Sequence, residues 1–207
     1  LEMLCQDPNT AGLIVEPLVL GAGGMVMYSP DDLNAMRNIA LGHGIPFLAD
    51  EVMTGFGRTG KLFATDRLTH PPDIICLSKG LTGGFMPMSL TVCSDAVYQS
   101  FLSSDPQRTF WHGHSYTANP LACAAALASL DLFDNPATME AIARIERAWA
   151  DAVPRLSARP GVRNVRACGT ILAFNLDSGR DEYLNPSGRA IQRACWERGL
   201  YIRPLGN

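Results

Sequence analysis

The amino-acid sequence predicts an α/β fold, with a mostly parallel sheet that carries helices on its faces, followed by a small α+β domain. Short, continuously apolar runs at 12–17, 45–49 and 73–78 are typical of strands buried on both faces. A helix is expected between the first two runs, and such alternation indicates a parallel sheet. The pattern changes after residue 134. We therefore expect one domain over residues 1–134 and a second over 135–207.

The elements of the first domain follow from local signals. Ser29-Pro30-Asp31-Asp32 combines a capping side chain, a proline at the first helical position and acids in the first turn, so a helix is expected from there to Gly42 or Gly44. The other expected elements are a glycine-rich loop at 21–24, a strand at 88–93, a short helix from Ser94 to about Phe101, and an alanine-rich helix from Asn119-Pro120 to Phe133.

The second domain begins at a turn signal, Asp134-Asn135-Pro136. An amphipathic helix is expected at 137–157, strands at 162–167 and 170–176, a helix at 187–198 and a last strand at 200–203. The sequence starts at Leu1, without a methionine, in what resembles the end of a helix, and it stops after an apolar run. We therefore expect the chain to be part of a longer protein, truncated at both ends.

Composition restricts the function class. The chain is 47% hydrophobic and 18% charged, and no apolar run approaches the roughly 18 residues of a membrane span. Its net charge of -3 argues against a nucleic-acid surface, so the expected partners are small molecules. The six cysteines lie far apart in apolar stretches and are expected to be buried. With no Cys-x-x-Cys pair and no secretory leader, the cytoplasm is the expected compartment.

Lysine is scarce, which limits the number of candidate residues for any lysine-based chemistry. Among the 17 basic residues only Lys61 and Lys79 are lysines. Lys61 follows a glycine loop, whereas Lys79 stands where a buried strand ends and is followed by Gly80. A lysine at a loop start is often simply solvated, but one desolvated at a strand end loses its proton more easily. Lys79 is therefore the candidate reactive amine.

Asp50-Glu51 follows the neighbouring strand. Paired acids after a strand are often no more than an exposed turn or a helix-start preference. In open α/β sheets, however, ligands lie beyond the carboxyl ends of the strands, where Asp50 and Lys79 are both expected. An amine for a Schiff base and a carboxylate that keeps a pyridine nitrogen protonated are what pyridoxal 5'-phosphate (PLP) requires. The pair predicts a PLP site.

Two other motifs are rejected. The stretch Gly55-Phe-Gly-Arg-Thr-Gly-Lys61 fits a dinucleotide fingerprint and most of a P-loop, but Leu62 stands where a P-loop needs serine or threonine, and no long helix opens at these glycines. His112 and His114 suggest a metal pair, but no third ligand lies at a suitable spacing, so we expect no metal site.

Three ordered runs carry a family resemblance: 48–64, which contains Asp50, 73–84, which contains Lys79, and 112–123, which begins His-Gly-His-Ser. Together they resemble class III aminotransferases. The resemblance implies fold type I of the PLP-dependent transferases, here as part of the large domain and part of the small C-terminal domain. It also implies a homodimer.

The resemblance assigns the cofactor residues position by position. Asp50 would pair with the pyridine nitrogen, Val52 would pack against one face of the ring, and Lys79 would form the Schiff base and later shuttle the proton. Ser115 falls where the family usually has threonine, which hydrogen-bonds the cofactor phosphate of the partner subunit. Its hydroxyl keeps that role, although a serine before a helix also occurs for local reasons.

The substrate residues come from a narrower resemblance. The runs 21–28 and 200–206 are most similar to the biotin-pathway members, which implies amino transfer from S-adenosylmethionine to 8-amino-7-oxononanoate. Arg203 would bind the carboxylate of the acceptor, and Gly113 and Arg58 would help to bind substrate. The alternatives are a class III transaminase acting on ornithine, 4-aminobutyrate or an ω-amino acid, and a fragment that is inert by itself because the family's earlier cofactor contacts are missing.

Overall fold

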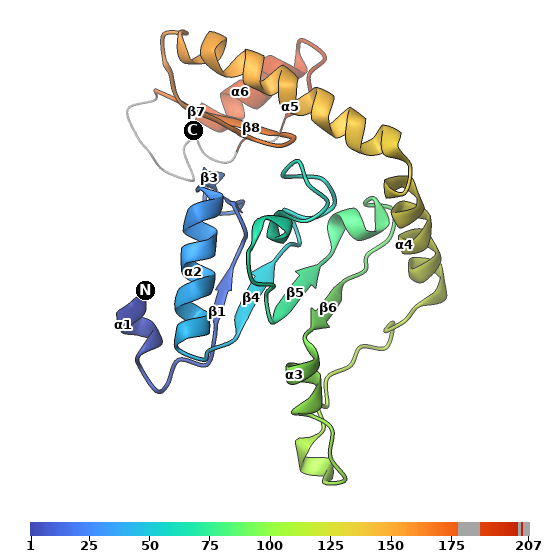
Figure 1. Ribbon diagram of the computed structural model, residues 1–207. Coiled ribbons are helices and arrows are strands. Elements are labelled where there is room, and N and C mark those ends of the chain that lie inside the picture. The colour runs from blue at the N-terminus through green and yellow to red at the C-terminus, as the bar shows by residue number, and fades with distance from the viewer. Residues whose placement is uncertain (178–186, 203, 205–207) are drawn as a thin grey trace.

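A computed structural model describes residues 1–177, 187–202 and 204 of the chain, and its central feature is a four-stranded sheet (Figure 1). The strands are β1 (Leu13–Val15), β4 (Phe47–Asp50), β5 (Ile74–Leu77) and β6 (Leu90–Cys93), in the order β1-β4-β5-β6. β4 pairs in parallel with both β1 and β5, and β6 runs antiparallel to β5. The predicted mostly parallel sheet is confirmed.

Helix α2 (Pro30–Gly42) packs on the sheet beside β1 and β4. The Ser29 hydroxyl accepts a hydrogen bond from the N–H of Asp32, and the Asp32 carboxylate accepts one from the N–H of Ser29, so the predicted cap is confirmed as a capping box. Farther along the helix, the buried Arg37 forms an ion pair with Oδ2 of Asp73 at 3.2 Å, and the same oxygen accepts a hydrogen bond from the N–H of Phe47 at 2.8 Å. This network fixes the helix to the edge of the sheet where β4 and β5 begin. A short helix, α1 (Glu2–Cys5), precedes β1.

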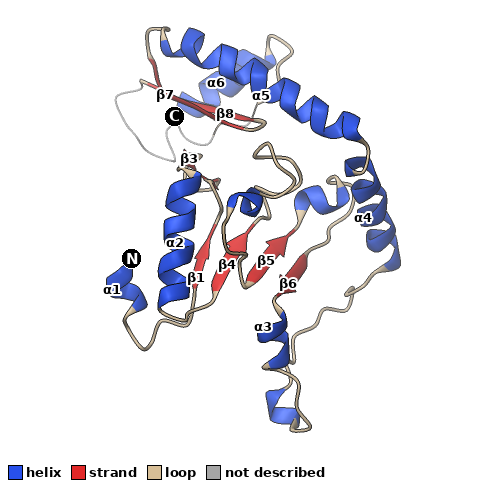
Figure 2. Cartoon of the chain, viewed as in Figure 1, coloured by secondary structure: helices blue, strands red, loops and turns tan. Residues whose placement is uncertain are grey.

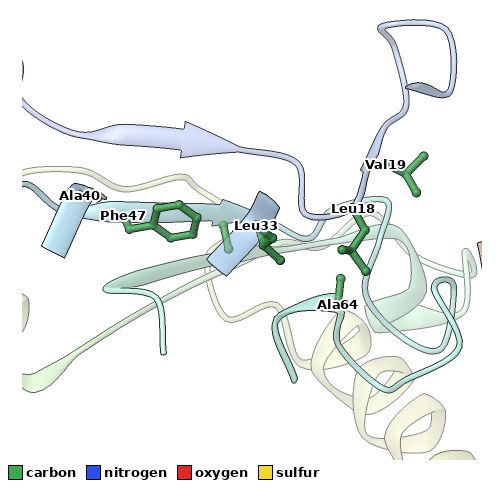
Figure 3. Packing of buried hydrophobic residues seen from close by; sticks show 7 residues of the cluster. Leu18, Val19, Leu33, Ala40, Phe47 and Ala64 are labelled. Atoms are coloured by element: carbon green, nitrogen blue, oxygen red, sulfur yellow. The ribbon is translucent and has the colours of Figure 1, made fainter. Parts of the chain in front are cut away.

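The hydrophobic core lies between α2, the sheet and the chain that follows β1 (Figure 3). Its fully buried side chains are Leu33 and Ala40 from the helix, Phe47 and Ala49 from β4, Leu18 and Val19 from the segment that follows β1, and Ala64 from the segment that follows β4. Burial of a leucine or phenylalanine side chain contributes about 1.5–3 kcal/mol, so this cluster stabilises the position of β4, the strand that carries Asp50.

The glycine-rich loop is the tip of a small antiparallel hairpin, formed by β2 (Val19–Leu20) and β3 (Val26–Met27). The sequence pattern predicted only the loop, because strands of two residues carry no periodic signal. Tyr28 closes the hairpin: its hydroxyl donates to the carbonyl of Glu16 at 2.6 Å, and burial raises its pKa to about 12.

After β6 the chain leaves the body of the sheet as a projecting segment and returns to a long helix (Figures 1 and 2). The projection contains α3 (Asp95–Gln99), capped by Ser94 as predicted, and the 3-10 helix η3 (Pro106–Arg108). α3 is shorter than the expected run to Phe101. The return leads to α4 (Pro120–Phe133), whose predicted cap is confirmed, since the Asn119 side chain accepts from the N–H groups of Leu121 and Ala122.

The rest of the chain forms a smaller α+β unit over one end of the sheet (Figure 2). It comprises α5 (Pro136–Ser157), the antiparallel strands β7 (Val162–Cys168) and β8 (Ile171–Leu176), and α6 (Ser187–Trp196). The turn at Asp134-Asn135 joins it to α4. A division of the chain at residue 134 stays a prediction.

Two expectations are wrong. Residues 200–202 form no strand, although Leu200 to Ile202 is apolar, and residue 203 lies outside the described residues. The cysteines are unpaired, but only Cys5 is buried, and Cys93 is exposed, as are the other residues of β6. None of the helices in the described part of the chain combines the length and apolar character that crossing a bilayer requires.

Candidate active site

Asp50 and Lys79 lie at the same edge of the sheet. Asp50 is the last residue of β4, and its register partner on β5 is Cys76, so Lys79 follows three residues beyond that pair. Because β4 and β5 are adjacent and parallel, their carboxyl ends meet at one edge. The two strands that end near Asp50 and Lys79 are thus adjacent and parallel, as predicted.

The Asp50 carboxylate is half-buried and has spare acceptor capacity. Its Oδ1 accepts a hydrogen bond from the N–H of Val52 at 3.1 Å, the only hydrogen bond to this side chain within the described residues. Burial raises the pKa of the neighbouring Cys76 thiol, and the Asp50 charge raises it further. The carboxylate therefore lies on the same face as Cys76, with Oδ2 available to a donor.

Lys79 occupies a tight turn directly beyond β5. It begins the 3-10 helix η2 (Lys79–Thr82) with a left-handed backbone, φ +45°. Gly80 is required next to it, since a Cβ there would stand 2.7 Å from Cβ of Phe56. The hydroxyl of Ser129 on α4 donates to the Gly80 carbonyl at 3.1 Å. The turn is thus clamped from two sides.

The side chain of Lys79 is exposed in the described chain, which corrects the expectation of a desolvated lysine. No described residue forms a hydrogen bond or ion pair with its amine. β5 delivers the lysine to the rim of the sheet, but the groups that would exclude water from it are not contributed by the described residues. The amine is therefore free for a ligand.

Glu51, next to Asp50, has a different role from its neighbour. Its side chain is fully buried and accepts four hydrogen bonds, from the hydroxyl of Thr54, the N–H of Ala64, and both the N–H and hydroxyl of Thr65, at 2.7–3.1 Å. Successive residues point to opposite sides of an extended chain, so one acid reaches the rim while the other is buried. Glu51 fixes the loop that follows Asp50.

The other expected site residues are dispersed. Val52 is half-buried beside Asp50, and Arg58 lies exposed in the loop that Glu51 anchors. Gly113 and Ser115 are exposed on the returning part of the projecting segment, and no described contact joins them to Lys79. Arg203 lies outside the described residues. The structure therefore places Asp50 and Val52 side by side, with Lys79 just beyond the end of the adjacent strand, and the phosphate and substrate assignments stay predictions.

The glycine loop contacts this site through its first residue. A Cβ on Gly21 would lie 2.5 Å from the sulfur of Met53, and the N–H of Gly21 donates to the Glu16 carboxylate at 3.0 Å. The tip of the loop is held by β7, because Arg166 of that strand donates to the carbonyls of Gly24 and Met25 at 2.7 Å each. Sequence patterns could not reveal these contacts, since Arg166 is more than 140 residues away.

No group of three or more histidine, cysteine or acidic side chains gathers in a metal-like cluster within the described residues. His114, one of the rejected metal candidates, accepts a hydrogen bond at Nδ1 from the N–H of Tyr116.

Known proteins are similar to this chain in sequence and in fold. Adenosylmethionine-8-amino-7-oxononanoate aminotransferases of Synechococcus elongatus and Geobacter sulfurreducens are 49% and 42% identical to the chain, each over 96% of its length. The crystal structure of the enzyme of that name from Methanocaldococcus jannaschii superimposes with a TM-score of 0.87 at 33% identity, over 94% of this chain and 47% of that one. An ornithine δ-aminotransferase of Plasmodium falciparum gives 0.83 at 31% identity, over 99% and 49%.

The chain spans about half the length of the curated relatives it matches, 46% and 45% for the two bacterial enzymes. The family model described as aminotransferase class-III matches residues 1–207, which is the whole chain. The chain belongs to the class III aminotransferases.

Proposed function

We propose that the full-length protein containing this chain is a PLP-dependent aminotransferase that transfers an amino group from S-adenosylmethionine to 8-amino-7-oxononanoate. One observation carries the catalytic part of this proposal: Asp50 and Lys79 lie at the carboxyl ends of adjacent parallel strands. The names of the relatives at 49% and 42% identity support the choice of substrates.

The residues present fit this cofactor. A protonated pyridine nitrogen needs a carboxylate with a free oxygen, and Asp50 offers Oδ2 beside a single hydrogen bond at Oδ1. An aldehyde needs an unpaired amine, and Lys79 has no partner among the described residues. When bound, PLP supplies an electron sink that stabilises negative charge at the substrate carbon.

The chain's own residues then have defined tasks. Asp50 holds a proton on the ring nitrogen, and the half-buried setting strengthens that interaction by keeping the local dielectric low. Val52 provides a branched apolar surface for one ring face. The Nζ of Lys79 removes the proton from the substrate carbon that bears the amino group and later returns one, as general base and acid.

The substrate assignments extend the same proposal. Arg203 would bind the acceptor carboxylate, for which a planar two-pronged donor is suited, and Gly113 and Arg58 would help to bind substrate. Ser115, on the exposed returning segment, would hydrogen-bond the cofactor phosphate of the other subunit in a homodimer. An exposed position on a segment that leaves the body of the sheet suits a contact across subunits. The cytoplasm stays the predicted compartment.

The first experiment is optical and uses the full-length protein. The wild type should show a yellow absorption band with added PLP, and Lys79→Ala should lose it. Lys61→Ala is the matched control, since Lys61 is the only other lysine of this chain, and it should keep the band. A colourless wild type, or a Lys79→Ala protein with an unchanged band, would overturn the cofactor assignment.

The second experiment concerns substrate and separates the rivals. Production of 7,8-diaminononanoate with S-adenosylmethionine as donor supports the biotin-pathway reading. Turnover only with ornithine, 4-aminobutyrate or another ω-amino acid would replace it with the alternative within the class. A full-length protein that binds PLP but transfers no amino group would point to a relative that has lost catalysis.

A further inference from the structure

A chain of hydrogen bonds runs from the second domain to Arg58. The indole N–H of Trp149 on α5 donates to the carbonyl of Thr170 at 2.9 Å. The N–H of Thr170, in the turn between β7 and β8, donates to the carbonyl of Arg58 at 2.9 Å. Arg58 is 112 residues earlier in the sequence and follows Asp50 in the loop that Glu51 anchors.

The Thr170 hydroxyl adds two further contacts to the same arginine. It donates to the Arg58 carbonyl at 3.2 Å and accepts from Nη1 of the guanidinium at 3.3 Å. A hydroxyl is suited to this, because it has one donor and two acceptor sites. Thr170 therefore restrains both the main chain and the side chain of Arg58, which as an exposed arginine would otherwise sample many rotamers.

The turn between β7 and β8 can approach the loop that contains Arg58 only because the turn contains a glycine. Gly169 has a left-handed backbone, φ +56°, and a Cβ there would lie 2.3 Å from backbone atoms of Thr59 and Gly60. The backbones of the two loops are thus in direct contact. The approach is specific to this pair of segments, and it fixes their separation.

The restrained guanidinium still has donors to offer. Within the described residues, Thr170 is the only partner of the Arg58 side chain, and it engages Nη1 alone. The N–H groups of Nη2 and Nε remain for a planar acceptor such as a carboxylate, which arginine binds with two parallel hydrogen bonds. Because the guanidinium is planar, the hydrogen bond that holds Nη1 in place also orients Nη2 and Nε.

We propose that Thr170, supported by Trp149, is a positioning residue that presents the Arg58 guanidinium to the carboxylate of an amino substrate. This rests on the proposed function, in which Arg58 takes part in substrate binding. Thr170 does not touch the substrate. It lowers the entropic cost of binding by fixing Arg58 beforehand.

The test uses the full-length enzyme loaded with PLP. Thr170→Val keeps the shape and removes the hydroxyl, and we expect KM for one carboxylate-bearing substrate to rise about fivefold, the factor given by one net hydrogen bond. The kcat and the visible band should not change. Thr170→Ser should restore the wild-type KM. Thr138→Val is the matched control, because within the described part of the chain that hydroxyl bonds only the Leu132 carbonyl, and its KM should be unchanged.

A double-mutant cycle separates positioning from general damage. In an Arg58→Ala background, Thr170→Val should raise KM no further. If Thr170→Val does not fold, Trp149→Phe provides a second test, because it removes only the indole donor. It should raise the same KM by a smaller factor.

An unchanged KM in Thr170→Val, or an equal further rise in the Arg58→Ala background, would overturn this inference alone. A wild-type enzyme that transfers no amino group would overturn the proposed function, and the inference with it.

Discussion

Glu51→Gln tests whether the buried acid organises the loop that follows Asp50. All four partners of the Glu51 carboxylate are donors, and two of them, the N–H groups of Ala64 and Thr65, cannot reverse. Each of the two carboxylate oxygens accepts a hydrogen bond from one of these N–H groups. In glutamine one oxygen becomes an NH2 group, so whichever way the amide turns, one buried backbone N–H meets another donor.

The magnitude follows from these contacts. A buried donor left unpaired costs about 1–3 kcal/mol. The bonds that survive change from charge-assisted to neutral, which weakens them by about 1 kcal/mol in total. Relief from burying a charge offsets part of this. We expect Glu51→Gln to lower the free energy of unfolding by about 2–3 kcal/mol.

Urea unfolding of the full-length protein, followed by tryptophan fluorescence, measures this difference. Glu140→Gln, an exposed substitution on α5, is the control and should shift the midpoint little. If Glu51→Gln unfolds at the same urea concentration as Glu140→Gln, the carboxylate is not the anchor of the 51–65 loop, and the reasoning from its four donors is refuted.

Three further outcomes are expected. Gly80→Ala should abolish most activity, because its Cβ would stand 2.7 Å from Phe56 and displace the lysine turn; near wild-type kcat would contradict this. Arg166→Met should destabilise the full-length protein by about 2 kcal/mol, since bonds to three backbone carbonyls are lost; an unchanged urea midpoint would count against a stabilising role. Burial raises the pKa of Tyr28 to about 12, so the unfolded state ionises first as the pH rises above about 10 and stability falls between pH 10 and 12, by about 1 kcal/mol after discounting for partial exposure. Tyr28→Phe should show a correspondingly shallower loss over that range, and equal slopes for both proteins would sink this assignment.

Local signals in the sequence predicted the elements that depend on local chemistry. Ser29 and Asn119 cap helices where expected, because a capping side chain acts on N–H groups within three residues of itself. Apolar runs located the three parallel strands, and the strand ends placed Asp50 and Lys79 at one edge.

Features that depend on distant parts of the chain could not be predicted in this way. Asp50 and Glu51 look alike in sequence, and only the fold shows that one lies at the rim and the other is buried. The hydrogen bonds between Thr170 and Arg58 join segments that are 112 residues apart in the sequence. The strand expected at 200–203 is wrong at 200–202, because an apolar run needs a neighbouring strand to pair with, and the described residues supply none.

The most direct test of the catalytic assignment is chemical. Borohydride makes the bond between PLP and its lysine permanent, and peptide mass spectrometry of the reduced full-length protein then locates it. We expect the added mass on the peptide that contains Lys79, with none on the peptide of Lys61. Labelling of Lys61, of a lysine elsewhere in the protein, or of no lysine would contradict the account.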